Sequence, residues 1–326
     1  MPETNLIVAL VGGLVLLAVS GDLLVNGSVA LGRRFGLSPL VAGIFIVGFG
    51  TSAPEMIVAL DAARSGYPNL ALGNIVGSNI ANVLLVLSIP ALIAPIKSGN
   101  WGQGTAWVAM ALATVGWITF LSTSGLSSSV AGLFLIALIG YAIFTLVAAR
   151  TASNAGVDTG VETSDRLSMG LGRAAGFTLV GIIGLPLGAQ LIVDSGVEIA
   201  QFYGVPQTLI GLTLLAVGTS LPEIGAGVAS ALRAKTDVLI GNVLGSNIFN
   251  ILGAGGLISF FGPLRAPETF QSYDHWVMAG AALILGTLIF FRLQLGRLFA
   301  ITMLLVYAVY IYGLVNDWNI RAAIGV

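Results

Sequence analysis

Long apolar stretches alternate with short polar breaks along almost the whole chain. Breaks such as Gly66-Tyr67-Pro68-Asn69 and Pro95-Ile96-Lys97 are rich in turn-forming or charged residues. A helix needs roughly 20 mostly apolar residues to cross the hydrocarbon core of a membrane. Ten stretches meet this requirement: about 5–25, 37–62, 70–92, 104–122, 127–149, 174–198, 206–231, 238–261, 275–291 and 297–315. The pattern predicts an all-α polytopic membrane protein with ten transmembrane helices.

The composition excludes several other classes of protein. Of the 326 residues, 56% are apolar and 8% are charged, whereas a soluble domain carries about 25% charged residues. This balance rules out an ordinary soluble enzyme and also a disordered chain. A net charge of −1 provides no basic surface, so no nucleic-acid partner is expected. With no Cys and one His, disulfides, thiolate nucleophiles and Cys- or His-rich metal sites are excluded.

The basic residues divide unevenly between the two sets of loops that ten spans define. Ten of the 13 fall in one set, and Arg64, Arg265 and Arg321 fall in the other. The richer set is expected to face the cytoplasm, which places both termini outside. The hydrophilic stretch 150–173 between the fifth and sixth spans is then a cytoplasmic linker.

Two polar motifs recur in the second half of the chain at one constant offset. Gly50-Thr51-Ser52-Ala53-Pro54-Glu55 returns as Gly218-Thr219-Ser220-Leu221-Pro222-Glu223. Gly73-Asn74-Ile75-Val76-Gly77-Ser78-Asn79-Ile80-Ala81-Asn82 returns as Gly241-Asn242-Val243-Leu244-Gly245-Ser246-Asn247-Ile248-Phe249-Asn250. Across 50–82 and 218–250, 13 of 33 positions are identical, so internal duplication is predicted.

The duplication predicts two repeats of opposite orientation. Each half contains five spans, an odd number, so the second half enters the membrane from the other side. The predicted organisation is a first five-helix repeat at 1–149 with its motif at 48–82, the linker at 150–173, and a second five-helix repeat at 174–326 with its motif at 216–250.

Glu55 and Glu223 lie well inside the second and seventh predicted spans. An ionised side chain at the bilayer centre costs at least about 2.5–3.5 kcal/mol, so an acid there is a functional candidate by default. No Lys, Arg or His falls at that depth to pair with either acid, so a proton or a bound cation must neutralise them. The same absence argues against an anionic substrate.

Neighbouring residues supply further oxygen atoms. Thr51 precedes Glu55 by four residues and shares its helix face, with Ser52 beside it, and Pro54 frees the Gly50 carbonyl. Thr219, Ser220, Pro222 and Gly218 repeat this arrangement around Glu223. The adjacent spans place two polar triplets on single faces: Asn74, Ser78 and Asn82, and Asn242, Ser246 and Asn250. Singly, each could be a kink or an interhelical hydrogen bond. Occurring twice as a set, these hard oxygen donors suit Ca2+ and Na+.

These motifs resemble the two α-repeats of the cation/Ca2+ exchangers, and within them the prokaryotic sodium/calcium exchangers. The resemblance implies ion ligation by these residues: Thr51, Ser52, Glu55, Ser78, Asn82, Thr219, Ser220, Glu223, Ser246 and Asn250, with carbonyl ligands near Gly48 and Ala216. It implies no cofactor, a prokaryotic inner membrane, and first and sixth spans that slide as gating helices over a core. Some members carry Asp where this chain has Asn250, so two carboxylates remain here and K+ co-transport is disfavoured.

The leading hypothesis is Na+/Ca2+ antiport by alternating access, with the two ions and the lipid bilayer as partners and no oligomer required. Two carboxylates carry −2, which one Ca2+ or more than one monovalent ion can cancel. The alternative is H+/Ca2+ exchange, although protons need no cage of polar oxygens. A cation channel is less expected, because channels usually ring a pore with several subunits. No substrate pocket signal accompanies an enzyme with a Glu55–Glu223 dyad, so no enzyme is expected.

Overall fold

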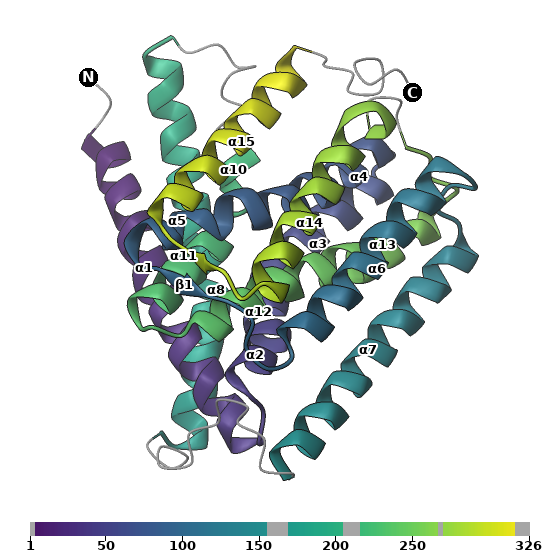
Figure 1. Cartoon of the computed structure of the whole chain (residues 1–326). Coiled ribbons are helices and arrows are strands. Elements are labelled where there is room, and N and C mark those ends of the chain that lie inside the picture. Colours follow the sequence, from purple (N-terminus) through teal and green to yellow (C-terminus); the bar gives the residue numbers. More distant parts are fainter. Residues whose placement is uncertain (1–3, 155–168, 205–215, 267–269, 317–326) are drawn as a thin grey trace.

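The computed structural model describes residues 4–154, 169–204, 216–266 and 270–316, which form a bundle of helices (Figure 1). Within this part of the chain, nine helices are long and apolar enough to span a membrane. A further apolar helix, Leu221–Leu232, is shorter. The prediction of an all-α polytopic membrane protein is therefore confirmed. The first part of the predicted seventh span, residues 206–215 of 206–231, lies outside the described residues.

The elements follow one another in chain order. The first half contains α1 (Thr4–Arg34), α2 (Pro39–Ala42), η1 (Gly43–Gly48), α3 (Phe49–Arg64), α4 (Pro68–Ala81), η2 (Asn82–Val86), α5 (Ser88–Ile93), β1 (Ile96–Lys97), α6 (Gln103–Ser122) and α7 (Ser128–Asn154). The second half contains α8 (Leu171–Phe202), α10 (Ala216–Gly218), α11 (Leu221–Leu232), α12 (Thr236–Ile248), η4 (Phe249–Ala254), α13 (Gly255–Ile258), η5 (Ser259–Phe261), η6 (Phe270–Asp274), α14 (His275–Phe290), β2 (Gln294–Leu295) and α15 (Arg297–Val315).

The turn residues of the sequence stand at the helix ends. Gly36 and Gly66 have φ angles of +69° and +83°, a region that glycine enters without steric cost. Ser38 caps α2 by accepting a hydrogen bond from the Val41 N–H at 3.3 Å, and Pro39 occupies the first turn.

The helices α1 and α8 are longer than the sequence pattern predicts. The first span was expected to end near residue 25, but α1 continues to Arg34. Asp22, the charge near the expected end, lies within this longer helix, where it forms an ion pair with Arg233 and accepts a hydrogen bond from Asn26 at 3.2 Å. At the linker, α7 continues to Asn154 and α8 starts at Leu171, so helices occupy both ends of the predicted 150–173 segment.

α1 and α8 lie side by side in close contact (Figure 1). A Cβ atom on Gly181 of α8 would lie 2.5 Å from the Leu24 Cβ, and one on Gly184 would lie 2.1 Å from Ser20 Oγ. Small residues allow membrane helices to approach this closely and to pack through van der Waals contact.

The helix α12 lies at the centre of the bundle. α12 opens the apolar stretch Thr236–Phe261, and 89% of the most apolar 18 residues of this stretch are buried. The corresponding share for α1 is 22%. α12 crosses the α2–η1 segment through two glycines, because a Cβ on Gly241 or Gly245 would lie 2.5 Å from the carbonyl oxygens of Leu40 or Ile44. The second half of the chain therefore inserts its central helix against the segment that leads into the first motif.

Short backbone pairings join loops of the two halves at two places. β1 pairs antiparallel with β2, with Ile96 opposite Leu295 and Lys97 opposite Gln294. Separately, Leu126 and Leu264 exchange backbone hydrogen bonds of 2.7 and 2.8 Å. The offset that relates the two motifs also relates Ile96 to Leu264, and Leu126 to Gln294. The Ile96–Leu295 pairing and the Leu126–Leu264 pairing therefore join equivalent loops of the two halves, as a repeat predicts.

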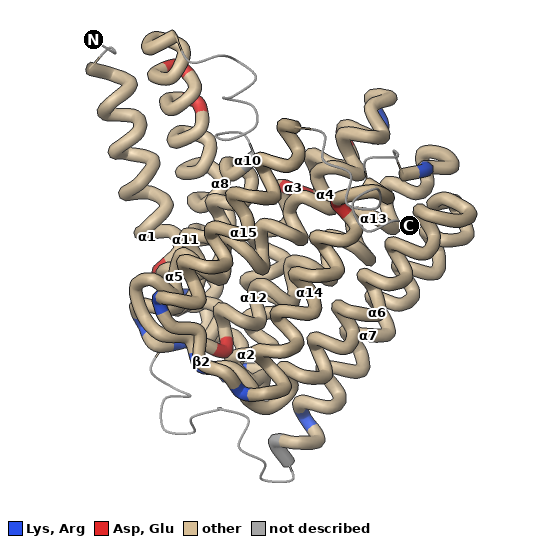
Figure 2. Tube along the Cα trace, turned by 45° about the horizontal axis from the view of Figure 1, so that its top comes forward, with Lys and Arg blue, Asp and Glu red and all other residues tan. Residues whose placement is uncertain are grey.

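Most Lys and Arg residues gather at one end of the bundle, near β2 (Figure 2). This clustering agrees with the uneven division of basic residues among the loops of the sequence.

Candidate functional site

Glu55 on α3 and Glu223 on α11 come together in the interior. The two residues are 2% and 1% exposed. Their carboxyl groups are close enough to interact with each other, and Ser52 Oγ donates a hydrogen bond to Glu223 Oε1 at 3.3 Å. One acid from each predicted repeat therefore enters a single buried cluster.

Several oxygens of this cluster lack a protein partner. Among the described residues, Glu55 Oε2, Glu223 Oε2 and Ser220 Oγ are buried and accept or donate no hydrogen bond. An unpaired buried polar atom is costly, and a buried carboxylate oxygen more so, because water is lost with nothing in exchange. A shared cation would satisfy these oxygens, so the donor set fits the ions that the sequence predicts.

The first motif contacts α12 of the second half through polar groups. Thr51 Oγ1 donates to Asn242 Oδ1 at 3.1 Å, and Ser246 Oγ donates to the Gly48 carbonyl oxygen at 3.3 Å. The Gly48 carbonyl, which the family resemblance implies as an ion ligand, therefore lies among Thr51, Asn242 and Ser246. Asn74 on α4 donates instead to the Glu55 backbone carbonyl at 2.9 Å.

The two motifs share a sequence but differ in backbone. α3 runs continuously through Pro54, whereas the second motif is interrupted by a turn at Thr219 and Ser220 between α10 and α11. Pro222 then stands in the first turn of α11, two residues after that break. Ala216, the other predicted carbonyl ligand, opens α10.

The remaining predicted ligands lie on the adjacent helices. Ser78 on α4 is 6% exposed, and Asn82 and Asn250 are each 1% exposed. Asn82 and Asn250 fall in the π-helical segments η2 and η4, a feature frequent at functional sites. Asn82 Nδ2 donates to Asn247 Oδ1 at 3.0 Å, a contact that sequence reasoning missed. The signal available for Asn247 was its place in the repeated Gly-Ser-Asn triplet.

A cavity of about 270 Å³ reaches the second motif beside α8. Thr219 and Pro222 line it together with Pro54 of α3 and Asp194 of α8. The half-buried Thr219 therefore has open space on one side, in contrast to the buried Thr51.

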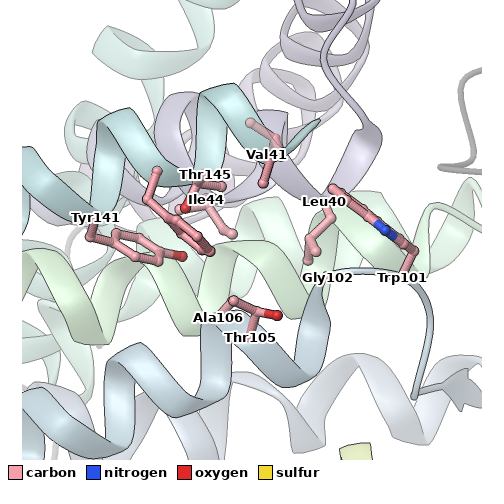
Figure 3. A pocket seen from close by; sticks show the side chains of 11 residues that line it. Leu40, Val41, Ile44, Trp101, Gly102, Thr105, Ala106, Tyr141 and Thr145 are labelled. Carbon is pink, nitrogen blue, oxygen red and sulfur yellow. The ribbon is translucent and has the colours of Figure 1, made fainter. Parts of the chain in front are cut away.

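A second cavity, of about 250 Å³, lies between α2–η1, α6 and α7 (Figure 3). Trp101, Thr105, Tyr141 and Thr145 line it with apolar neighbours. None of the described residues that line it is acidic, so this cavity is separate from Glu55 and Glu223.

The fold and the paired acids are typical of a membrane protein that carries cations through its interior. Among the described residues, no three or more His, Cys, Asp or Glu side chains lie close enough together to hold a metal ion by themselves. The candidate site therefore consists of two carboxylates surrounded by neutral hydroxyl, amide and carbonyl oxygens.

Comparison with known proteins identifies the family. The family model described as "Sodium/calcium exchanger protein" matches residues 5–150 and 173–316. The inner membrane protein YrbG of Escherichia coli (strain K12) is 34% identical over 86% of this chain and 87% of its own. The sodium/calcium exchanger MaX1 of Methanosarcina acetivorans is 28% identical over 95% of this chain and 98% of its own.

A solved structure of the sodium-calcium exchanger NCX_Mj, soaked with zero Na+ and Ca2+, superposes with a TM-score of 0.80. It is 29% identical and covers 96% of this chain and 100% of its own. The chain belongs to the sodium/calcium exchanger protein family. This is a family of membrane transporters, not of enzymes, and the predicted resemblance to the sodium/calcium exchangers is confirmed.

Proposed function

We propose that the protein exchanges Na+ for Ca2+ by alternating access, with Glu55 and Glu223 as ligands that both ions share. The observation that carries this proposal is the meeting of the two acids, one from each half, with unpartnered oxygens at 1–2% exposure. Two buried carboxylates so close together favour a compensating charge of +2, which one Ca2+ supplies. Na+ ions binding to the same oxygens would displace it, which couples the two fluxes.

The proposed ligand set is the one implied by the sequence motifs. Ser52 contacts Glu223 directly, while Thr51 donates to Asn242 and Ser246 donates to the Gly48 carbonyl. Ser78, Asn82, Thr219, Ser220, Asn250 and the Ala216 carbonyl complete the set. The coordination of each ion would use a subset of these oxygens, since Ca2+ takes about six to eight oxygen ligands.

The proposed movement uses α1 and α8. Their close glycine packing supports a pair that slides as a unit over the core formed by α3, α4, α11 and α12. The cavity beside α8 that reaches Thr219 supports an ion path along this helix. The two five-helix repeats, in inverted orientation and joined by the 150–173 linker, would provide the symmetry for opening on each side in turn.

The proposed orientation places the basic end of the bundle in the cytoplasm and both termini outside. The support is the excess of Lys and Arg at that end (Figure 2). The expected location is a prokaryotic inner membrane, which is the location that the name of the relative, inner membrane protein YrbG, gives for that protein.

The counter-ion decides between Na+/Ca2+ and H+/Ca2+ exchange. Purified protein in liposomes would be given external Ca2+ with either an outward Na+ gradient or a pH gradient as the sole driving force. We expect Ca2+ uptake with the Na+ gradient and little with the pH gradient. Uptake that follows pH and ignores Na+ would show proton exchange, and flux without any counter-ion would show a channel.

Matched carboxamide variants test the two acids. Glu55→Gln and Glu223→Gln keep the size of the side chain and remove its charge, so each should abolish Ca2+ uptake. Each should also remove the Ca2+-dependent rise in the unfolding midpoint, because a ligand stabilises only the state that binds it. Full uptake by either variant would exclude that acid as a ligand.

A further inference from the structure

Asn247 of α12 joins two other helices through its side-chain amide. The residue is 3% exposed. Its Oδ1 accepts a hydrogen bond from Asn82 Nδ2 at 3.0 Å, and its Nδ2 donates to Met110 Sδ of α6 at 3.4 Å. Both ends of the amide are therefore engaged.

The Met110 sulfur determines which way the Asn247 amide faces. A thioether sulfur can only accept a hydrogen bond, whereas an amide has a donating amino end and an accepting carbonyl end. Met110 therefore selects the amino end of Asn247, which leaves the Asn247 carbonyl oxygen toward Asn82. An acceptor at that place in turn selects the amino end of Asn82.

The orientation of Asn82 follows from amide geometry. Its amino and carbonyl groups leave the same carbon atom in different directions. Because Nδ2 is directed to Asn247, the Asn82 Oδ1 points away from it. A carbonyl oxygen attracts a cation, whereas an amino group in the same place repels one.

We propose that Asn247 is a positioning residue, which holds Asn82 with its carbonyl oxygen toward the transported cation. This inference rests on the proposed function, in which Asn82 is a ligand. Without Asn247, the Asn82 amide can turn over and present its amino group to the ion, so the cation affinity falls.

The other repeat lacks this arrangement. Asn79, the counterpart of Asn247 in the first motif, is also 3% exposed but donates to the Ile75 carbonyl of its own helix at 2.7 Å. Asn250, the counterpart of Asn82, has both amide atoms buried without a partner among the described residues. Of the two equivalent amides, one is held in orientation by a neighbour and the other is not.

Asn79 provides a matched control for the test. Asn247→Leu removes both hydrogen bonds at similar side-chain size, and Asn79→Leu makes the same change in an equally buried residue. Met110→Leu removes the sulfur acceptor while conserving volume, a change that protein cores tolerate. The apparent Ca2+ affinity is measured by titrating the unfolding midpoint of the purified protein with Ca2+ alone. KM and Vmax for Ca2+ uptake are measured in liposomes.

We expect Asn247→Leu to weaken the Ca2+ affinity by about fivefold to thirtyfold, with KM affected more than Vmax. Met110→Leu should weaken it by about twofold to fivefold, because sulfur is a weak acceptor. Asn79→Leu should change the affinity by less than about twofold. Without Ca2+, however, it should lower the unfolding midpoint about as much as Asn247→Leu does. In an Asn82→Ala background, Asn247→Leu should cause no further loss, because it acts through Asn82.

Equal changes in affinity for Asn247→Leu and Asn79→Leu would overturn the inference, as would an effect of Asn247→Leu that persists in the Asn82→Ala background. If Asn247→Leu does not fold, an unchanged affinity in Met110→Leu overturns it instead. The Ca2+ titration does not depend on the counter-ion. Failure of Na+-driven uptake in the unaltered protein would therefore refute the antiport while the positioning of Asn82 is still tested.

Discussion

Gly245 lies where α12 crosses the α2–η1 segment, and the crossing leaves no room for a side chain. A Cβ atom there would lie 2.5 Å from the Ile44 carbonyl oxygen and 2.8 Å from the Ile44 Cα. Ordinary van der Waals contact begins at 3.4 Å, so Gly245→Ala requires the two backbones to separate by about 0.9 Å. Both neighbouring atoms belong to the backbone, so no side-chain rotation can relieve the overlap.

The expected cost follows from this overlap. Overpacking a well-filled core typically costs about 1–3 kcal/mol. Alanine recovers about 0.5–1 kcal/mol through its better helix propensity, which is too little to cancel the larger values. The separation also lengthens the hydrogen bond from Ser246 to the Gly48 carbonyl, already 3.3 Å, beyond a useful distance. Stability and Ca2+ uptake should therefore fall together.

The assay compares thermal unfolding in detergent and Ca2+ uptake in liposomes for Gly245→Ala and Gly140→Ala. Gly140 is exposed on α7, and a Cβ there meets no atom within 4 Å. We expect a midpoint lower by about 2–6 °C for Gly245→Ala and no loss for Gly140→Ala. Equal midpoints and equal uptake for the two variants would refute the reasoning that α12 needs glycine at this crossing.

Three further substitutions test the packing and the polar contacts by equilibrium unfolding. Asp22→Asn weakens the ion pair with Arg233, and because these side chains are 40% and 46% exposed, we expect a cost of only about 0.2–1 kcal/mol; a larger cost would point to a wider network. Trp117→Ala should cost about 3–5 kcal/mol, since Trp117 is 0% exposed, and a cost near zero would contradict its burial. Tyr310→Phe removes the hydrogen bond of 2.8 Å to the buried Asp274 and should cost about 1–3 kcal/mol; Tyr67→Phe, at an exposed position, is the control.

The periodicity of apolar residues and the placement of charges along the sequence predict much of the fold. Apolar length alone predicts the membrane-spanning helices, because the hydrocarbon core imposes it. The motif offset predicts that Glu55 and Glu223 are equivalent, and the structure brings their carboxyl groups together. The assignment of ion ligands stays a prediction.

Other features depend on contacts between distant segments, which a pattern along one chain does not contain. Asp22 lies inside α1, beyond which the helix continues, and it pairs with Arg233 at the end of α11, a partner that the sequence pattern does not reveal. The two identical Thr-Ser pairs differ, since one lies within α3 and the other in the turn before α11. Asn82 and Asn79 are both amides in the same motif, yet only the tertiary neighbours decide where each amide points.

The pairing of β1 with β2 has a consequence for how the chain is made. Ile96 cannot meet Leu295 until translation has reached residue 295. At about 5–20 residues per second, translation of the intervening segment takes about 10–40 s. During that time the first helices already reside in the lipid with this loop unpaired. This loop of the first half is therefore paired only after the second half has been made, and not when the first half is inserted.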